Sequence, residues 1–314
     1  MSAAAESPLP PPVDPHAAAR EVTRLSVAVA VILIAMKAFA LGASGSVSIL
    51  ASLADSALDL AASLATFFAV RWAAAPPDDE HRYGHGKGEA MAALVQAGLI
   101  FASTVFIGWE AISRMIDPRP VTGGGWGVAV ILASSLLTGW LVWRQTRTIR
   151  ASGSLAVGAD RTHYASDLAG NLVVLIGVAS GAWLQAPGLD AAAGLVVAIW
   201  IFWGATGLLR RSADHLLDRQ APEADRIAVT EAVLADPRIG GVHRMRTRLA
   251  GTTLVVQMHI DLAADLSLQA AHEILEEAER RIQAVRPGAD VMIHPDPHGA
   301  GPDARTAVPS SLIG

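Results

Sequence analysis

The sequence predicts an all-α membrane domain of six transmembrane helices, followed by a small soluble α+β domain. The first observation behind this fold class is composition. Of 314 residues, 52% are hydrophobic and 17% charged, and the mean hydropathy is +0.39, which is too apolar for an ordinary soluble protein. The second observation is that apolar runs of membrane length stop near Arg210, where charge density rises. The third is that a few ionisable residues interrupt those runs.

The N-terminal residues 1–23 are rich in Ala and Pro and lack a basic region leading into a short apolar core. We therefore expect a disordered tail and not a cleavable signal. A transmembrane domain over residues 24–210 follows. Its six segments are each close to the ~20 residues that cross ~30 Å of hydrocarbon. They are Leu25–Ala43, Ile49–Trp72, Met91–Met115, Trp126–Trp143, Val157–Leu184 and Ala191–Leu209.

The connections between these segments differ in charge, and this predicts their orientation. The connections GASGS and QAPGLD are short and nearly uncharged. Arg114 and Arg119, beside Asp117, are an exception on the same side. The positive-inside rule, applied to the sum of the connections, places both termini in the cytoplasm. The basic residues of the alternate connections are Arg71, Arg82, Lys87, Arg144, Arg147, Arg150 and Arg161.

The C-terminal region, residues 211–298, predicts a soluble domain with the order helix, strand, strand, helix, strand. Residues 221–237 have helical periodicity and end at a proline, and residues 241–262 alternate around a Gly-Thr turn. Ser267 is the expected N-cap of the second helix. This order favours helices on one face of a three-stranded sheet. Residues 299–314 are expected to be a disordered tail.

Composition also excludes some functions. The chain has no cysteine, so it can form neither disulfides nor thiolate metal sites, and a bound metal must use oxygen and imidazole nitrogen. The net charge is −5, and there is no basic tract or nucleic-acid-binding motif. We therefore expect no nucleic-acid partner.

Two polar pairs with the same spacing lie inside membrane-length segments: Asp55 with Asp59, and His163 with Asp167. Residues four apart share one face of a helix, and an ionisable side chain in hydrocarbon costs ~2.5 kcal/mol or more. If the second and fifth helices are neighbours, the four side chains suit a tetrahedral divalent metal such as zinc. The alternative is structural: the Asp55/Asp59 pair bonds helix ends or Lys37, and the other pair lies at a hydrated interface.

Two further clusters have metal-ligand chemistry. Asp78, His81 and His85 lie within eight residues of the loop after the second helix, and neighbouring glycines allow the loop to fold around an ion. A solvated polar loop is the alternative. Four histidines of the C-terminal domain form the second cluster with an aspartate, and ordinary surface histidines are the alternative to a metal site there. The residues of this second cluster are His243, His259, His272, His294 and Asp296, with His272 on a helix that could cover the strands.

Several motifs in the same order resemble the cation diffusion facilitator family, particularly its bacterial zinc and iron efflux branch. They are GSVSILASLADSALDL, DDEHRYGHGKGEA, GADRTHYASD, HLLDR and VMIHPDP, and the resemblance extends from about Leu25 to Pro297. It implies a six-helix membrane domain, a cytoplasmic domain resembling a metallochaperone (ferredoxin-like), and a homodimer that exchanges divalent metal for protons.

The resemblance also assigns residues. It makes Asp55, Asp59, His163 and Asp167 the transport site and Asp78, His81 and His85 a loop site. It places a dimer-associated cytoplasmic site at the five residues of the C-terminal cluster, and it implies a charge interlock between Lys87 and Asp218. Pro295 stands where related sequences often have glutamine, so a bridging role at that position is weakened.

The predicted function is therefore not enzymatic. We expect a secondary transporter of the bacterial inner membrane that exports zinc first, then iron(II) or cadmium, in exchange for protons, because imidazole among carboxylates favours these metals over magnesium or calcium. His163 is the expected proton carrier. A metal-gated channel or sensor is one alternative. A membrane-embedded zinc hydrolase is another, although no HExxH or nucleophile motif supports it.

Overall fold

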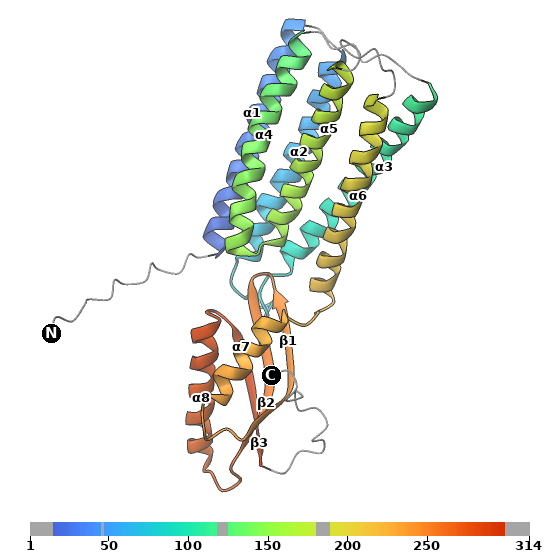
Figure 1. The fold of residues 1–314 in the computed structure, drawn as a ribbon. Helices are drawn as coiled ribbons and strands as arrows, with labels where there is room; N and C mark the ends of the chain where they lie inside the picture. Colours follow the sequence, from blue (N-terminus) through green and yellow to red (C-terminus); the bar gives the residue numbers. More distant parts are fainter. Residues whose placement is uncertain (1–14, 45–46, 118–124, 180–188, 299–314) are drawn as a thin grey trace, which may run out of the picture. The chain divides into compact units, whose positions relative to one another are not determined.

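The computed structural model describes residues 15–44, 47–117, 125–179 and 189–298 (Figure 1). The chain forms two compact units, Met1–Ala213 and Asp214–Gly314, and each is described by itself. Most of the two predicted tails, and the predicted end of the fifth segment at Leu184, lie outside the described residues.

The described part of the first unit contains six long helices. α1 begins at Pro15, inside the predicted N-terminal tail. A proline fits the first turn of a helix, and the alanines that follow have the highest helix propensity. The helices are α1 (Pro15–Ser44), α2 (Val47–Ala73), α3 (Gly88–Ile116), α4 (Gly125–Ser152), α5 (Leu155–Ala179) and α6 (Leu189–Leu216).

Among the described residues, five helices are long and apolar enough to cross a membrane, so a multi-pass membrane domain is supported. They are α1, α2, α3, α4 and α6. The fifth predicted span is a helix of 25 residues, α5. It is not among the helices that are long and apolar enough to cross a membrane. The reason is its composition, because α5 carries Asp160, Arg161 and Asp167. The prediction of six spans is thus supported for five.

Helix packing places α5 against α2, α3 and α4, while α1 packs on α2 and α4 (Figure 1). Small side chains allow this close approach, as where Ala93 and Ala97 of α3 and Ala159 of α5 share a buried cluster with Ala205 of α6. The sequence left open whether the second and fifth helices are neighbours, and the contact between α2 and α5 resolves that question.

The described part of the second unit has the predicted order: α7 (Glu223–Leu234), β1 (Gly241–Ala250), β2 (Thr253–Leu262), α8 (Leu268–Val285) and β3 (Asp290–Pro297). The sheet order is β1-β2-β3, with β1 antiparallel and β3 parallel to β2. Gly251, at φ +64°, and Thr252 form the hairpin turn. A parallel neighbour requires a crossover, which α8 provides.

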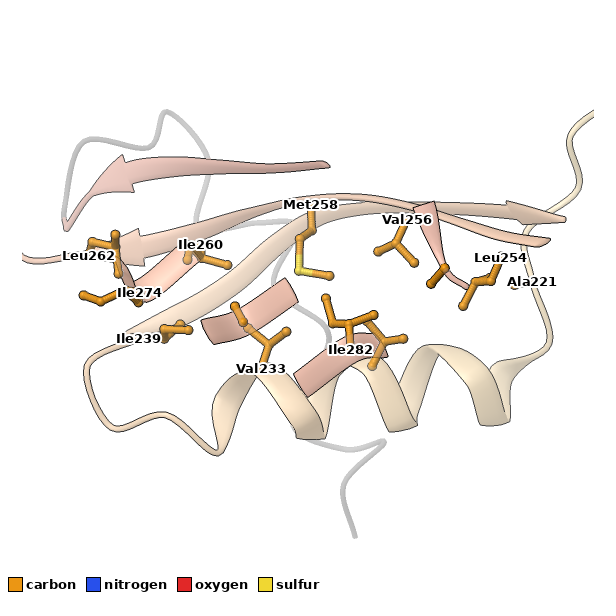
Figure 2. Close-up of a cluster of buried hydrophobic side chains, with 13 residues drawn as sticks. Ala221, Val233, Ile239, Leu254, Val256, Met258, Ile260, Leu262, Ile274 and Ile282 are labelled. Carbon is orange, nitrogen blue, oxygen red and sulfur yellow. The ribbon is translucent and has the colours of Figure 1, made fainter. Parts of the chain in front are cut away.

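The core of this unit lies between the sheet and its helices (Figure 2). Alternate residues of β2, namely Val256, Met258 and Ile260, are buried there with Ile282 of α8. Ser267 caps α8 as predicted, because its hydroxyl accepts a hydrogen bond from the Ala270 amide at 3.2 Å. The opposite face of the sheet carries the intervening residues of β2, among them the polar Gln257, His259 and Asp261.

Candidate metal sites

The contact between α2 and α5 brings one residue of the first predicted pair onto the second pair. His163 Nε2 lies 3.0 Å from Asp59 Oδ1 and 3.8 Å from Asp167 Oδ2. One ligand atom from each of the three side chains lies within 4.8 Å of the others, as a shared cation requires. Asp59 is 5% exposed, so this group lies inside the helical unit.

Asp55 is part of the same cavity but not of this group. The cavity has a volume of about 1090 Å³, and Asp55, Asp59, His163 and Asp167 all line it. Asp55 lies one helical turn before Asp59, which displaces it by ~6 Å along the axis, and its carboxylate is not among the three that converge. Asn171, one further turn along α5 from Asp167, also lines this cavity.

One carboxylate oxygen of this group is suited to bind a metal. Asp167 Oδ2 is buried and has no hydrogen-bond partner among the described residues. Buried carboxylate oxygens are usually bonded, because an unsatisfied one costs ~1–3 kcal/mol or more. The donor set of two carboxylates and one imidazole suits a borderline divalent metal, so the residues present fit such an ion.

A buried polar network beside this group was not predicted. Asp160, 1% exposed, accepts hydrogen bonds from Gln145 Nε2 at 2.7 Å and Ser63 Oγ at 3.3 Å. Ser63 Oγ and Tyr164 Oη are 2.8 Å apart, and Gln145 Nε2 also reaches Ser26 Oγ at 3.1 Å. The network joins α1, α2, α4 and α5 around the α5 turn before His163. The sequence alone could have pointed to Asp160, since it too is an ionisable residue within a membrane-length stretch.

The loop between α2 and α3 gathers the second predicted set. Asp78 Oδ1 is 3.3 Å from His81 Nδ1, and Asp78 Oδ2 is 3.1 Å from His85 Nε2. Backbone hydrogen bonding from His81, at 2.6 Å to Asp78 Oδ1, holds the pKa of that carboxyl below its usual range. Ionised oxygen beside two imidazoles is a suitable ligand set for zinc.

The position of this loop is set by aromatic packing. Trp72 at the end of α2 contacts the rings of His81 and His85, with centroids 6.0 and 5.3 Å apart. Gly88 opens α3 against the same indole, and a Cβ at that position would lie 2.9 Å from Trp72 Cε3. Gly84 adopts φ +76°, which the glycine tolerates and which turns the loop back toward Asp78.

The third set lies on the polar face of the second unit's sheet. His243, His259 and His294 occupy one row across β1, β2 and β3. Asp296 Oδ2 is 3.0 Å from His243 Nε2 and 2.9 Å from His259 Nδ1. The pKa of the Asp296 carboxyl lies below its usual range, chiefly because of the hydrogen bond with His259. His294 Nε2 approaches Asp296 Oδ1 at 3.3 Å and completes this row.

His272 does not join this row within one chain. Its helix, α8, packs on the opposite face of the sheet through Ile274 and Ile282. The His272 side chain is 66% exposed, and its Nε2 lies 3.3 Å from Glu276 Oε1. The expectation that this helix covers the strand histidines is therefore corrected, because α8 covers the apolar face. Pro295 pairs in register with Ile260.

The two residues of the predicted interlock belong to different units. Lys87 occupies the N-cap position of α3 in the first unit. Asp218 follows α6 in the second unit and has a left-handed backbone, with φ +56°. Its Oδ1 accepts a hydrogen bond from Arg248 Nη1 of β1 at 3.1 Å. The Lys87–Asp218 pairing stays a prediction.

Membrane-length helices around a buried group of carboxylates and imidazole define a membrane protein that handles metal cations. Comparison with known families agrees. Residues 23–217 match the cation efflux transmembrane domain, and residues 221–298 match the cytoplasmic domain of cation efflux proteins. The chain belongs to the cation efflux family, and it is therefore a transporter of metal cations and not an enzyme.

Curated relatives cover nearly the whole chain. The cation-efflux pump FieF of Cronobacter sakazakii is 39% identical over 285 residues, which are 90% of this chain and 95% of that protein. The cation-efflux pump FieF of Shewanella oneidensis is 41% identical over 277 residues, or 88% of this chain and 93% of that protein. The resemblance noted from the motifs is thus confirmed at the level of the family.

Proposed function

We propose that this protein exports divalent metal cations from the cytoplasm in exchange for protons, with zinc the first substrate and iron(II) and cadmium next. The observation that carries the proposal is the group of Asp59, His163 and Asp167, whose ligand atoms converge inside a cavity lined by membrane-length helices. Asp55, one turn away on the same cavity wall, is the proposed fourth ligand. Carboxylate and imidazole without thiolate favour zinc and iron(II) over copper(I).

Proton exchange follows from the chemistry of these ligands. A metal binds carboxylate and neutral imidazole, so protons and metal compete for the same atoms. His163 is the proposed proton carrier because imidazole is the side chain that ordinarily titrates near ~6.5. Loading from a neutral cytoplasm releases protons, and acid on the other side displaces the metal. Rocking of helices around the cavity would then expose it alternately to the two sides.

The remaining predicted sites are proposed in supporting roles. The loop group of Asp78, His81 and His85 would hold a metal near the start of α3. The row of His243, His259, His294 and Asp296 would hold a resident metal in the cytoplasmic domain of a homodimer. His272 could contribute to that site only from another copy of the chain. We further propose a charge interlock between Lys87 and Asp218. The protein would lie in an inner membrane with both termini in the cytoplasm.

The test is zinc transport into proteoliposomes driven by a pH difference. We expect the wild-type protein to accumulate zinc against its gradient and to move protons in the opposite direction. Asp59→Asn and Asp167→Asn should each reduce transport by at least ~100-fold, because each replaces a carboxylate ligand with a neutral amide. The matched control is Asp79→Asn, which removes a carboxylate whose side chain is 93% exposed in the neighbouring loop.

Two outcomes would contradict the proposal. Zinc that only equilibrates across the membrane, with no accumulation under a pH difference, would indicate a channel. Transport at the wild-type rate in both ligand variants would show that Asp59 and Asp167 do not form the transport site.

A further inference from the structure

A buried lysine lies beside the proposed transport site and has no role in the mechanism above. Lys37 of α1 is 9% exposed and lines the same cavity as the four site residues. Its ammonium donates to Ser56 Oγ at 2.6 Å and to the Ser52 carbonyl at 3.1 Å. Ser52 and Ser56 share a face of α2 with Asp55 and Asp59, at the same four-residue spacing.

The charged groups that line the cavity can be counted. Arg114 Nε bonds Glu110 Oε1 at 2.8 Å, so this pair contributes no net charge. Three carboxylates, Asp55, Asp59 and Asp167, then face one ammonium, and His163 is neutral when it binds metal. With the carboxylates ionised, three negative charges and one positive charge give the described lining of the cavity a net charge of −2 before a metal binds. Among the residues that the structure describes, the charged or titratable ones that line the cavity are Lys37, Asp55, Asp59, Glu110, Arg114, His163, Tyr164 and Asp167.

We propose that Lys37 is a specificity-determining residue that sets the charge of the transport cavity to match a dication. A divalent metal neutralises a cavity of −2, whereas the same three carboxylates without Lys37 would match a trivalent cation. Charge matching is strong where water is scarce, since the interaction of two unit charges grows as the effective dielectric constant falls. The lysine also weakens metal binding, because it repels the cargo, and so favours release.

A role through charge and a purely structural role for Lys37 predict opposite changes in metal affinity when the lysine is replaced. If Lys37 served only to hold α1 against α2 through Ser52 and Ser56, its loss would loosen the cavity and weaken metal binding. If it acts through its charge, Lys37→Gln removes a repulsion and tightens binding. Lys37→Arg keeps the charge and should rescue the wild-type affinity.

The experiment measures binding of Zn²⁺ and of Tb³⁺ to the full chain in detergent. The loop and C-terminal sites are first removed with Asp78→Ala and His259→Ala, so that the transport site is observed alone. In this background we expect Lys37→Gln to tighten Zn²⁺ binding by on the order of tenfold, and Tb³⁺ binding by more, since the gain scales with ion charge. Lys37→Met, which retains the apolar stem, should shift both affinities in the same direction.

Weaker or unchanged Zn²⁺ affinity in both neutral variants would overturn the role of Lys37, as would a Tb³⁺ affinity that rises no more than that of Zn²⁺. The inference rests on the proposed transport site, so the background is also tested with Asp59→Asn and Asp167→Asn. If Zn²⁺ binding survives these changes, the site assignment and the role of Lys37 both fail. If it is lost while Lys37→Gln has no effect, the role of Lys37 alone fails.

Discussion

Asp236 shows, at the scale of one residue, how a hydrogen-bonded partner of opposite charge stabilises a buried carboxylate. Its side chain is 2% exposed and accepts hydrogen bonds from Arg238 Nε at 2.9 Å and Nη2 at 2.7 Å. These hydrogen bonds with Arg238 lower the pKa of the Asp236 carboxyl from 3.8 to about 2. The folded state therefore holds the ionised form more tightly than the unfolded state does.

The lowered pKa of Asp236 makes the stability of the folded state fall as the pH falls. Because the folded pKa is lower, the unfolded chain binds more protons between pH ~4 and ~2, and this contribution to stability is lost as pH falls through that window. We expect Asp236→Asn to reduce the free energy of unfolding by about 2 kcal/mol at pH 7 and by much less near pH 2. Urea unfolding of a fragment covering residues 214–298 measures this difference.

The control for that measurement is Asp265→Asn, at an exposed position before α8. Its effect should be small at both pH values, because surface charges contribute little. An Asp236→Asn effect that is the same at pH 7 and pH 2 would show that packing, and not the ion pair, is responsible.

Individual residues also show what the sequence could predict about the sites. The spacing of His163 and Asp167 placed both on one face of α5, and the structure brings both to Asp59. The same spacing placed Asp55 on the face of Asp59, yet periodicity cannot tell which of two turns meets the facing helix. His272 could not be placed from sequence, because the pattern of β2 does not state which face of the sheet α8 covers.

At the scale of elements, the start of α3 depends on a glycine that lets the loop site pack. A Cβ at Gly88 would lie 2.9 Å from Trp72 Cε3, and Trp72 contacts the rings of His81 and His85. We expect Gly88→Ala to reduce stability by about 1–3 kcal/mol, as overpacking does. It should also weaken zinc binding at the loop. Thermal unfolding in detergent and zinc titration measure the two effects.

Gly98 of the same helix provides the matched control. A Cβ there would have nothing within 4 Å in the structure. Gly98→Ala should be neutral or slightly stabilising, since alanine favours helix over glycine. Equal losses from the two substitutions would contradict the role of the Gly88–Trp72 contact.

Most elements could be predicted because each has a simple physical signature. Apolar length identifies α1, α2, α3, α4 and α6, and alternation around Gly251 identifies the hairpin of β1 and β2. The fifth segment was also predicted as a helix, and α5 forms there, although the polar residues that build the site lower its hydropathy. Its side chains Asp160 and Tyr164 are buried by neighbouring helices, which no local pattern records.

At the scale of the whole molecule, the two units have separate cores. The core of the second unit is built from its own residues between Ala221 and Ala289, with α7, α8 and the sheet all contributing (Figure 2). A domain of the size of the second unit can bury enough apolar surface to fold alone. The first unit instead exposes large apolar side chains, such as Phe39 at 73% and Trp109 at 72%, as expected of helices that face lipid.

The second unit should therefore fold in the absence of the first. We expect a fragment of residues 214–298 to be soluble and to unfold cooperatively, because its sheet and buried core are complete within that range. Two changes on α8 test whether the fragment has the packing seen here. Ile282→Ala, at 0% exposure, should cost about 2–5 kcal/mol, whereas Val285→Ala, at 45% exposure, should cost less than about 1 kcal/mol. Circular dichroism during urea unfolding measures both. A fragment without a cooperative transition, or with equal losses from the two substitutions, would show that this core forms only within the intact membrane protein.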